Sequence, residues 1–94
     1  MRVAWTRVAL SQLDQIQDYI AQDSPIAAYR VAADLTTRTD RQLSANPMSG
    51  RNGRARGTRE LIFADMPYVV VYRVGAEVEI VAVIHSAREW PETF

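Results

Sequence analysis

Apolar residues in the first part of the chain recur at helical spacing. Ala9, Leu13, Ile16 and Ile20 are separated by four, three and four positions, so they share one side of a helix. Thr6 precedes this run, and its hydroxyl can accept a hydrogen bond from the first helical turn as an N-cap. The pattern predicts an amphipathic helix that begins after Thr6 and buries one face.

A second helix is predicted directly after the first. Ser24 is the expected N-cap and Pro25 the first helical residue, where a missing N–H costs nothing. The apolar residues expected on its buried side are Ala28, Val31, Ala32, Leu35 and Leu43. Thr39 interrupts this stripe, and the helix should end near Ala45, because a residue before proline, here Pro47, is disfavoured in helical geometry. The two helices should form a hairpin.

The second half of the chain has the composition of β-strands. Residues 47–57 hold three glycines and no apolar period, so they are expected to form an exposed loop. Strands are predicted where β-branched and aromatic residues gather, at Val3–Trp5, Thr58–Phe63, Tyr68–Val74 and Glu77–His85. The last three should form an antiparallel meander. The expected fold is therefore α+β and a single domain over residues 1–94, with the helix hairpin on one face of the sheet.

A two-residue turn at Gly75-Ala76 would fix the register of the last two strands. In that register one face gathers Val69, Val71, Arg73, Val78, Ile80, Ala82 and Ile84, and should pack on the helices. The other face gathers Tyr68, Val70, Tyr72, Glu77, Glu79, Val81, Val83 and His85. No helix remains to cover this second face, so it is expected to be exposed and to bind a partner.

Composition excludes several kinds of chemistry. The chain has no cysteine, one histidine and no lysine, which rules out disulfides, thiolate metal sites, histidine clusters and lysine catalysis. We expect neither a metal nor a cofactor. No apolar run approaches the roughly 20 residues of a membrane span, and the N-terminus lacks a signal peptide, so a cytoplasmic protein without a membrane partner is predicted.

Charge is unevenly distributed although the formal net charge is zero. Five arginines and no acid lie between Arg41 and Arg59, whereas acidic residues dominate from Glu60 onward. Such a basic segment suits either a solvated loop or contact with phosphate or an acidic protein surface. A nucleic-acid module without other function is the weakest interpretation, because the whole chain is neutral.

Several short sequences resemble the ParE/RelE family of toxins. They are Asn46-Pro47 with Gly50-Arg51, Gly57-Thr58-Arg59-Glu60-Leu61, residues 67–74, Val83-Ile84-His85 and Arg88-Glu89-Trp90-Pro91, in the family's order. The predicted order of strand, helix hairpin, loop and three strands is similar to the family's fold. The resemblance implies the toxin of a type II toxin–antitoxin module, associated with plasmid stabilisation and growth inhibition. It also implies a hetero-oligomer with a ParD-like ribbon-helix-helix antitoxin, whose C-terminal segment wraps the toxin.

The resemblance leaves two targets open. RelE-like members cleave messenger RNA in the ribosome, and ParE-like members inhibit DNA gyrase without catalysis. RNA cleavage needs a base, an acid and cations around the phosphate. The candidates for those roles are Arg59, Arg73, His85 and Arg88. The best-known ribonucleases of the family use lysine and arginine with a tyrosine near the C-terminus, whereas this chain lacks lysine and ends in Phe94. The ParE-like interpretation is therefore preferred.

A partner is expected to contact the basic loop, the second face of the sheet and the tail. The predicted partner-binding residues are Arg51, Arg54, Arg56, Arg59, Tyr68, Tyr72, His85, Arg88 and Trp90. Arg59 and Glu60 are adjacent on a strand and should point to opposite faces, which argues against a catalytic pair. Trp90, with its large apolar area, should also anchor the tail against the sheet.

Overall fold

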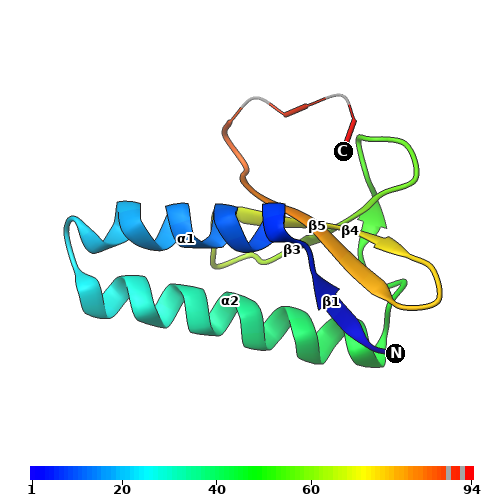
Figure 1. Cartoon of the computed structure of the whole chain (residues 1–94), viewed down its shortest axis with the longest axis horizontal. Helices are drawn as coiled ribbons and strands as arrows, with labels where there is room; N and C mark the ends of the chain where they lie inside the picture. Colours follow the sequence, from blue (N-terminus) through cyan, green and yellow to red (C-terminus); the bar gives the residue numbers. More distant parts are fainter. Residues whose placement is uncertain (89, 92) are drawn as a thin grey trace.

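The two predicted helices form an antiparallel hairpin in the computed structural model, which describes residues 1–88, 90–91 and 93–94 (Figure 1). Helix α1 spans Arg7–Ala21 and helix α2 spans Pro25–Ala45. The N-caps are as predicted, because the Thr6 and Ser24 hydroxyls each accept a hydrogen bond of 3.2 Å from the backbone N–H three residues ahead. Among the described residues, neither helix combines the length and apolarity needed to cross a membrane.

The strands form one mixed sheet of five members. They are β1 (Val3–Trp5), β2 (Arg51–Asn52), β3 (Arg59–Ile62), β4 (Tyr68–Val74) and β5 (Val78–His85), in the spatial order β1-β5-β4-β3-β2. β1 runs parallel to β5, and the other pairs are antiparallel. The α+β fold with a C-terminal meander is therefore confirmed. β2 was not predicted, because two residues are too few to show an alternating pattern; it adds an edge strand inside the expected loop.

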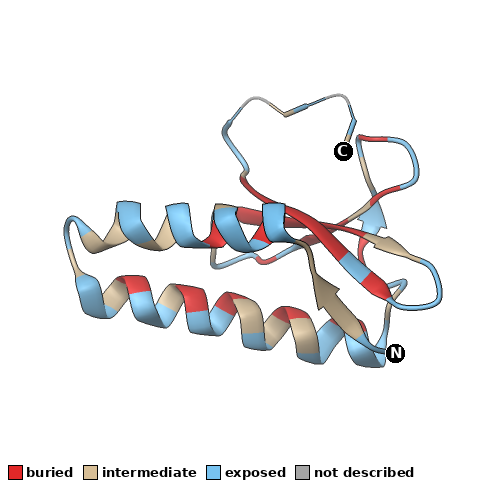
Figure 2. Cartoon of the chain, viewed as in Figure 1, coloured by how far each residue is buried: buried red, intermediate tan, exposed pale blue. Residues whose placement is uncertain are grey.

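The main core lies between the helix hairpin and one face of the sheet (Figure 2). The helices contribute Ala9, Leu13, Ala32, Leu35 and Leu43, and the sheet contributes Leu61, Tyr68, Val70, Tyr72, Val78, Ile80 and Val83. Thr39, predicted to interrupt the stripe of α2, is fully buried on the same side. The buried stripe of α2 is therefore longer than its apolar residues alone indicate.

The predicted register of the last hairpin is wrong. Val74 pairs with Val78, so three residues connect the strands instead of two. A β-bulge then shifts the register again, since Tyr72 pairs with Ile80 but Val71 pairs with Ala82. A bulge inserts one unpaired residue, and each single-residue shift exchanges the two faces of a strand.

The face assignments change accordingly. On β4 the helix-facing residues are Tyr68, Val70 and Tyr72, all predicted to be exposed. On β5 the prediction is correct for Val78 and Ile80, before the bulge. Beyond the bulge it is reversed, because Val83 faces the helices while Ala82 and Ile84 lie in a second cluster.

The face of the sheet that lies away from the helices is covered by the C-terminal tail. Val71, Val81, Ala82 and Ile84 form a buried cluster, against which Trp90 and Phe94 pack. The prediction that Trp90 anchors the tail is confirmed. Both faces of the central strands are therefore buried, and the described residues leave no open apolar face on the sheet.

Ile80→Ala should lower the free energy of unfolding by about 2 to 4 kcal/mol, because Ile80 is fully buried between helices and sheet. Ile16 was predicted to be equally buried but only packs at the edge of the core, so Ile16→Ala should cost about half as much. Urea unfolding measures both, with exposed Gln15→Ala as control. An Ile80→Ala loss no larger than that of the control would contradict the packing described here.

Candidate functional site

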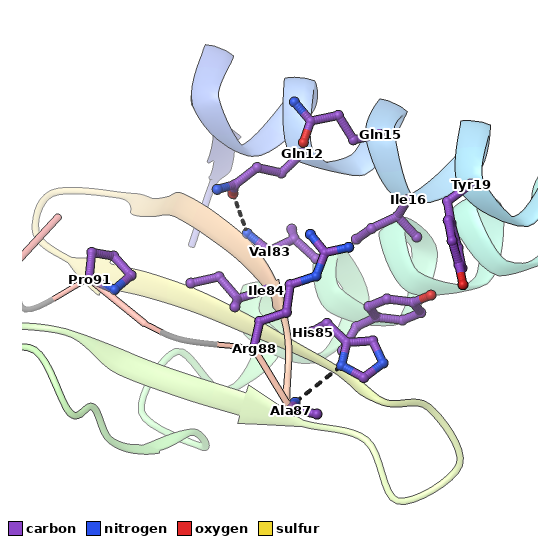
Figure 3. A pocket seen from close by; sticks show the side chains of 11 residues that line it. Gln12, Gln15, Ile16, Tyr19, Val83, Ile84, His85, Ala87, Arg88 and Pro91 are labelled. Carbon is purple, nitrogen blue, oxygen red and sulfur yellow. Dashed lines mark hydrogen bonds between the residues drawn. The ribbon is translucent and has the colours of Figure 1, made fainter.

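A groove of about 690 Å³ lies between α1 and the end of β5 (Figure 3). Gln12, Gln15, Ile16 and Tyr19 line it from α1. Tyr68, Val83, Ile84 and His85 line it from the sheet, and Ala87, Arg88 and Pro91 from the tail. Three predicted site residues, Tyr68, His85 and Arg88, are thus brought together, although they come from β4, β5 and the tail.

His85 ends β5 and is fixed by two neighbours. The backbone N–H of Ala87 donates to His85 Nδ1 at 3.1 Å, so in the neutral ring the proton lies on Nε2. The Tyr68 and His85 rings meet edge to face, with centroids 5.6 Å apart. In this tautomer Nε2 is the atom of His85 that can donate a hydrogen bond, and the turn that follows the strand holds the ring in place.

Tyr68 was predicted to be exposed, but only its edge reaches the groove. Its exposed fraction is 8%, because its ring packs into the main core. Burial raises the pKa of Tyr68, Arg88 opposes the rise and Tyr19 adds to it, with a net upward shift. The phenol therefore stays protonated at neutral pH and is able to donate a hydrogen bond.

The other two catalytic candidates lie elsewhere and bind backbone carbonyls. Arg59 Nη2 donates to the carbonyls of Met48 at 2.9 Å and Gly50 at 2.6 Å. Arg73 Nη2 donates to the Phe94 carbonyl at 2.7 Å. Neither Arg59 nor Arg73 lines the groove, so His85 and Arg88 are the only two of the four catalytic candidates that share it.

A second polar cluster organises the arginine-rich loop, residues 51–56, around one buried carboxylate. Glu60, on β3, has an exposed fraction of 1%. Its Oε1 accepts from Arg51 Nη2 at 2.8 Å and from Arg51 Nε at 3.1 Å, and its Oε2 accepts from the Arg54 backbone N–H at 2.8 Å. Burial raises the pKa of Glu60, but the bonds from Arg54 and Arg51 outweigh it, and the pKa lies below its ordinary value of 4.5.

The loop also contacts the tail. The Arg54 guanidinium lies 3.8 Å from the centroid of the Trp90 ring, in a cation–π contact. Arg56 is exposed at the tip of the loop. Of the predicted basic surface, Arg51 and Arg54 are thus partly engaged within the chain, and Arg56 faces solvent.

Tyr72 is a core residue and not part of the surface predicted for it. Its exposed fraction is zero, and its hydroxyl accepts a hydrogen bond of 2.9 Å from the Gly50 N–H. A Cβ at Gly50 would lie 2.5 Å from that hydroxyl, so glycine is needed for this close approach. Tyr72 therefore connects the centre of the sheet to the start of the arginine-rich loop.

Sequence reasoning missed the contribution of α1 to the groove. Gln12 Oε1 accepts a hydrogen bond of 2.8 Å from the Val83 N–H, and Tyr19 is exposed at the groove's end. In the sequence, polar residues on the open side of an amphipathic helix indicate only a solvent-exposed surface. The only available signal was the exposed aromatic Tyr19 near the end of α1.

A helix hairpin on a mixed sheet, with a groove beside α1 and an arginine-rich loop, has the architecture of a small toxin of a toxin–antitoxin module. Residues 3–90 match the family model described as ParE toxin of type II toxin-antitoxin system, parDE. The chain therefore belongs to the ParE toxin family.

Relatives agree over nearly the whole chain. The protein Y4kP of Sinorhizobium fredii, provisionally named a toxin, is 47% identical over 97% of this chain and 94% of its own length. Toxin RelE2 of Caulobacter vibrioides is 44% identical over 93% of this chain and 97% of its own. A chain of the solved chromosomal ParDE TA system from P. aeruginosa is 30% identical, with a TM-score of 0.80 over 90% of this chain and 95% of that one. The likeness thus extends over nearly the whole chain and its fold.

Proposed function

We propose that this ParE-family toxin acts by binding DNA gyrase, and that a cognate ParD-like antitoxin encoded beside it neutralises the toxin in a hetero-oligomer. The observation that carries the proposal is the separation of the candidate catalytic residues. Arg59 and Arg73 hold backbone carbonyls of their own chain, and only His85 and Arg88 share the groove. A phosphate clamp for RNA cleavage needs several cations around one point.

The proposal of an antitoxin partner is supported by the family and by the ParDE structure. The name of that neighbour describes a toxin–antitoxin system, and its chain aligns with 90% of this one. This chain also keeps exposed apolar side chains on its helices, with Tyr19, Ile26 and Tyr29 at least 66% exposed. Surfaces of this kind suit a partner that shields them.

The test is a supercoiling assay with purified protein, DNA gyrase, ATP and relaxed plasmid. The toxin should block supercoiling or trap cleaved DNA, and it should leave messenger RNA intact in a translation reaction. His85→Gln should keep this inhibition, because glutamine is polar and of similar size and no proton transfer is required. Plasmid that becomes fully supercoiled in excess toxin would contradict the proposal.

The alternative is a ribosome-dependent messenger RNA endonuclease. One observation favours it, namely that Tyr68, His85 and Arg88 line one groove as a phenol, an imidazole and a cation. In that case His85→Gln should lower the cleavage rate by roughly 10² to 10⁴, the usual effect of removing an acid or base. If the cleavage rate falls in this way and gyrase is unaffected by the toxin, the target is the ribosome and not gyrase.

A further inference from the structure

The outer edge of β5 is only half covered by a neighbouring strand. β1 pairs with Val78, Glu79 and Ile80, and its chain then turns away into α1. From Val81 to His85 the described residues place no strand on this edge. At about 3.3 Å per residue, the uncovered part is roughly 16 Å long, enough for a segment of four or five residues.

Backbone groups on this part of β5 point into the groove. The Val83 N–H bonds to Gln12 Oε1 and so points away from β4. In an antiparallel pair, a residue whose N–H points away from its partner strand also turns its C=O away, and residues two apart behave alike. His85 follows Val83 by two and pairs with Tyr68 as Val83 pairs with Val70. The Val83 C=O and the His85 N–H therefore also face the groove.

Gln12 occupies the position of a missing strand. Its Oε1 lies 2.8 Å from the Val83 nitrogen, where the carbonyl of an added strand would lie (Figure 3). A side chain on the surface of α1 can rotate away, whereas a backbone carbonyl of a folded element cannot. The Gln12 amide thus protects an open strand edge in the free protein. An unprotected strand edge would be a template for pairing with another chain.

The groove is complementary to an acidic ligand. Arg88, His85, Tyr68 and Tyr19 line it, and each carries a group that can donate a hydrogen bond. None of the described residues that line the groove is an aspartate or glutamate. Ile16, Val83 and Pro91 supply apolar contacts between these donors. A segment with alternating acidic and apolar side chains would match both features.

We propose that an extended acidic segment of the antitoxin adds as a strand to the outer edge of β5 in this groove, displaces Gln12 from Val83 and places a carboxylate on Arg88. The inference rests on the proposed neutralisation by an antitoxin and specifies where and how that partner binds. Strand addition uses main-chain hydrogen bonds for affinity and side-chain contacts for specificity.

The test uses the full chain and the product of the reading frame adjacent to it. Binding is measured by calorimetry, and amide exchange by NMR in the free and bound toxin. The His85 amide should exchange at least about tenfold more slowly in the complex. Arg88→Gln should weaken binding about 10- to 100-fold, the usual effect of losing a hydrogen bond to a charged group. Arg30→Gln, an exposed arginine on α2 outside the groove, should bind like the unchanged protein.

Two variants of Gln12 separate a displaceable amide from a merely structural one. Gln12→Glu keeps an acceptor for Val83 and adds a negative charge, so it should weaken binding about tenfold. Gln12→Ala removes the group to be displaced, so binding should be as tight as before or tighter. A structural role would weaken binding in both variants alike.

Three results would overturn the inference. If the partner binds but the exchange of His85 is unchanged and Arg88→Gln has no effect, the antitoxin binds elsewhere and the proposed neutralisation stands. Protection of His85 that rises with the concentration of free toxin would assign the edge to a second copy of this chain. If the partner does not bind, the proposed neutralisation fails together with the inference.

Discussion

Replacing Tyr72 by alanine is expected to lower the free energy of unfolding by about 3 to 5 kcal/mol, the usual cost of removing a large buried aromatic side chain. Tyr72 is fully buried in the main core, and its hydroxyl accepts the Gly50 N–H. The change would leave a cavity in the centre of the sheet and release the start of the arginine-rich loop. The total free energy of unfolding of a small domain is roughly 5 to 15 kcal/mol. The loss should therefore appear as a large fall in the urea concentration at the midpoint of unfolding.

Two further tyrosine variants control this prediction. Tyr72→Phe keeps the ring but leaves the Gly50 N–H without its acceptor, so it should cost about 1 to 3 kcal/mol. Tyr29→Ala changes a side chain that is 69% exposed and should cost less than about 0.5 kcal/mol. If Tyr72→Ala were as stable as Tyr29→Ala, the register described here would be wrong and the predicted exposed face would be restored.

The helical half of the fold was predictable because its signals are local. Thr6, Ser24 and Pro25 specify helix starts through their own side chains, and the apolar spacing of α1 repeats along one face. Each of these signals needs no knowledge of a distant partner. The predicted starts of both helices, and the predicted end of the second helix near Ala45, accordingly agree with the structure.

The hairpin register was not predictable from the alternation of side chains. β4 and β5 are apolar on both faces, so Val69 and Val71 suit a core as well as Val70 does. The register depends on a three-residue turn and on a bulge near Val81. Neither feature can be recognised from the alternation of apolar and polar residues. The tail supplies the apolar cover for the face of the sheet that lies away from the helices, whereas the sequence predicted that a partner would bind on that side.

Single residues of the site were predictable, but their surroundings were not. His85 and Arg88 were identified by chemical type, and the groove places them together. The role of Gln12 depends on how α1 lies against β5, 71 positions further along the chain. The roles of Arg51 and Arg54 depend on the burial of Glu60, which no local pattern reveals.

Glu60→Lys should be among the most destabilising changes in the chain, with a loss of about 3 to 5 kcal/mol. The substitution places a cation at a position that is 1% exposed, beside the Arg51 guanidinium and the Arg54 N–H. Both donors would lose their acceptor. The Arg54 guanidinium also lies near, with its Nε 3.8 Å from Glu60 Oε1, so the new cation and the two arginine side chains would repel one another. The arginine-rich loop should then lose its structure, which would appear as faster amide exchange at residues 51–56.

Glu60→Gln is the matched mild change, because its amide oxygen still accepts hydrogen bonds and only the charge is lost. It should cost about 1 to 2 kcal/mol at neutral pH, the difference between charged and neutral hydrogen bonds. The effect depends on pH with a definite sign. The folded pKa of Glu60 is lowered, so its contribution is fully present above the unfolded value of about 4.5 and is lost as the pH falls through the folded value.

The difference in Tm between the unchanged protein and Glu60→Gln should therefore be constant between about pH 6 and 8 and shrink below about pH 4.5. Asp65, whose pKa is lowered by hydrogen bonds from Arg38, titrates in the same acidic range, but it is present in both proteins and cancels in the difference. A difference that stays constant down to pH 3 would show that the charge of Glu60 does not stabilise the loop. In that case the hydrogen bonds alone, which glutamine preserves in part, would hold Arg51 and Arg54 in place.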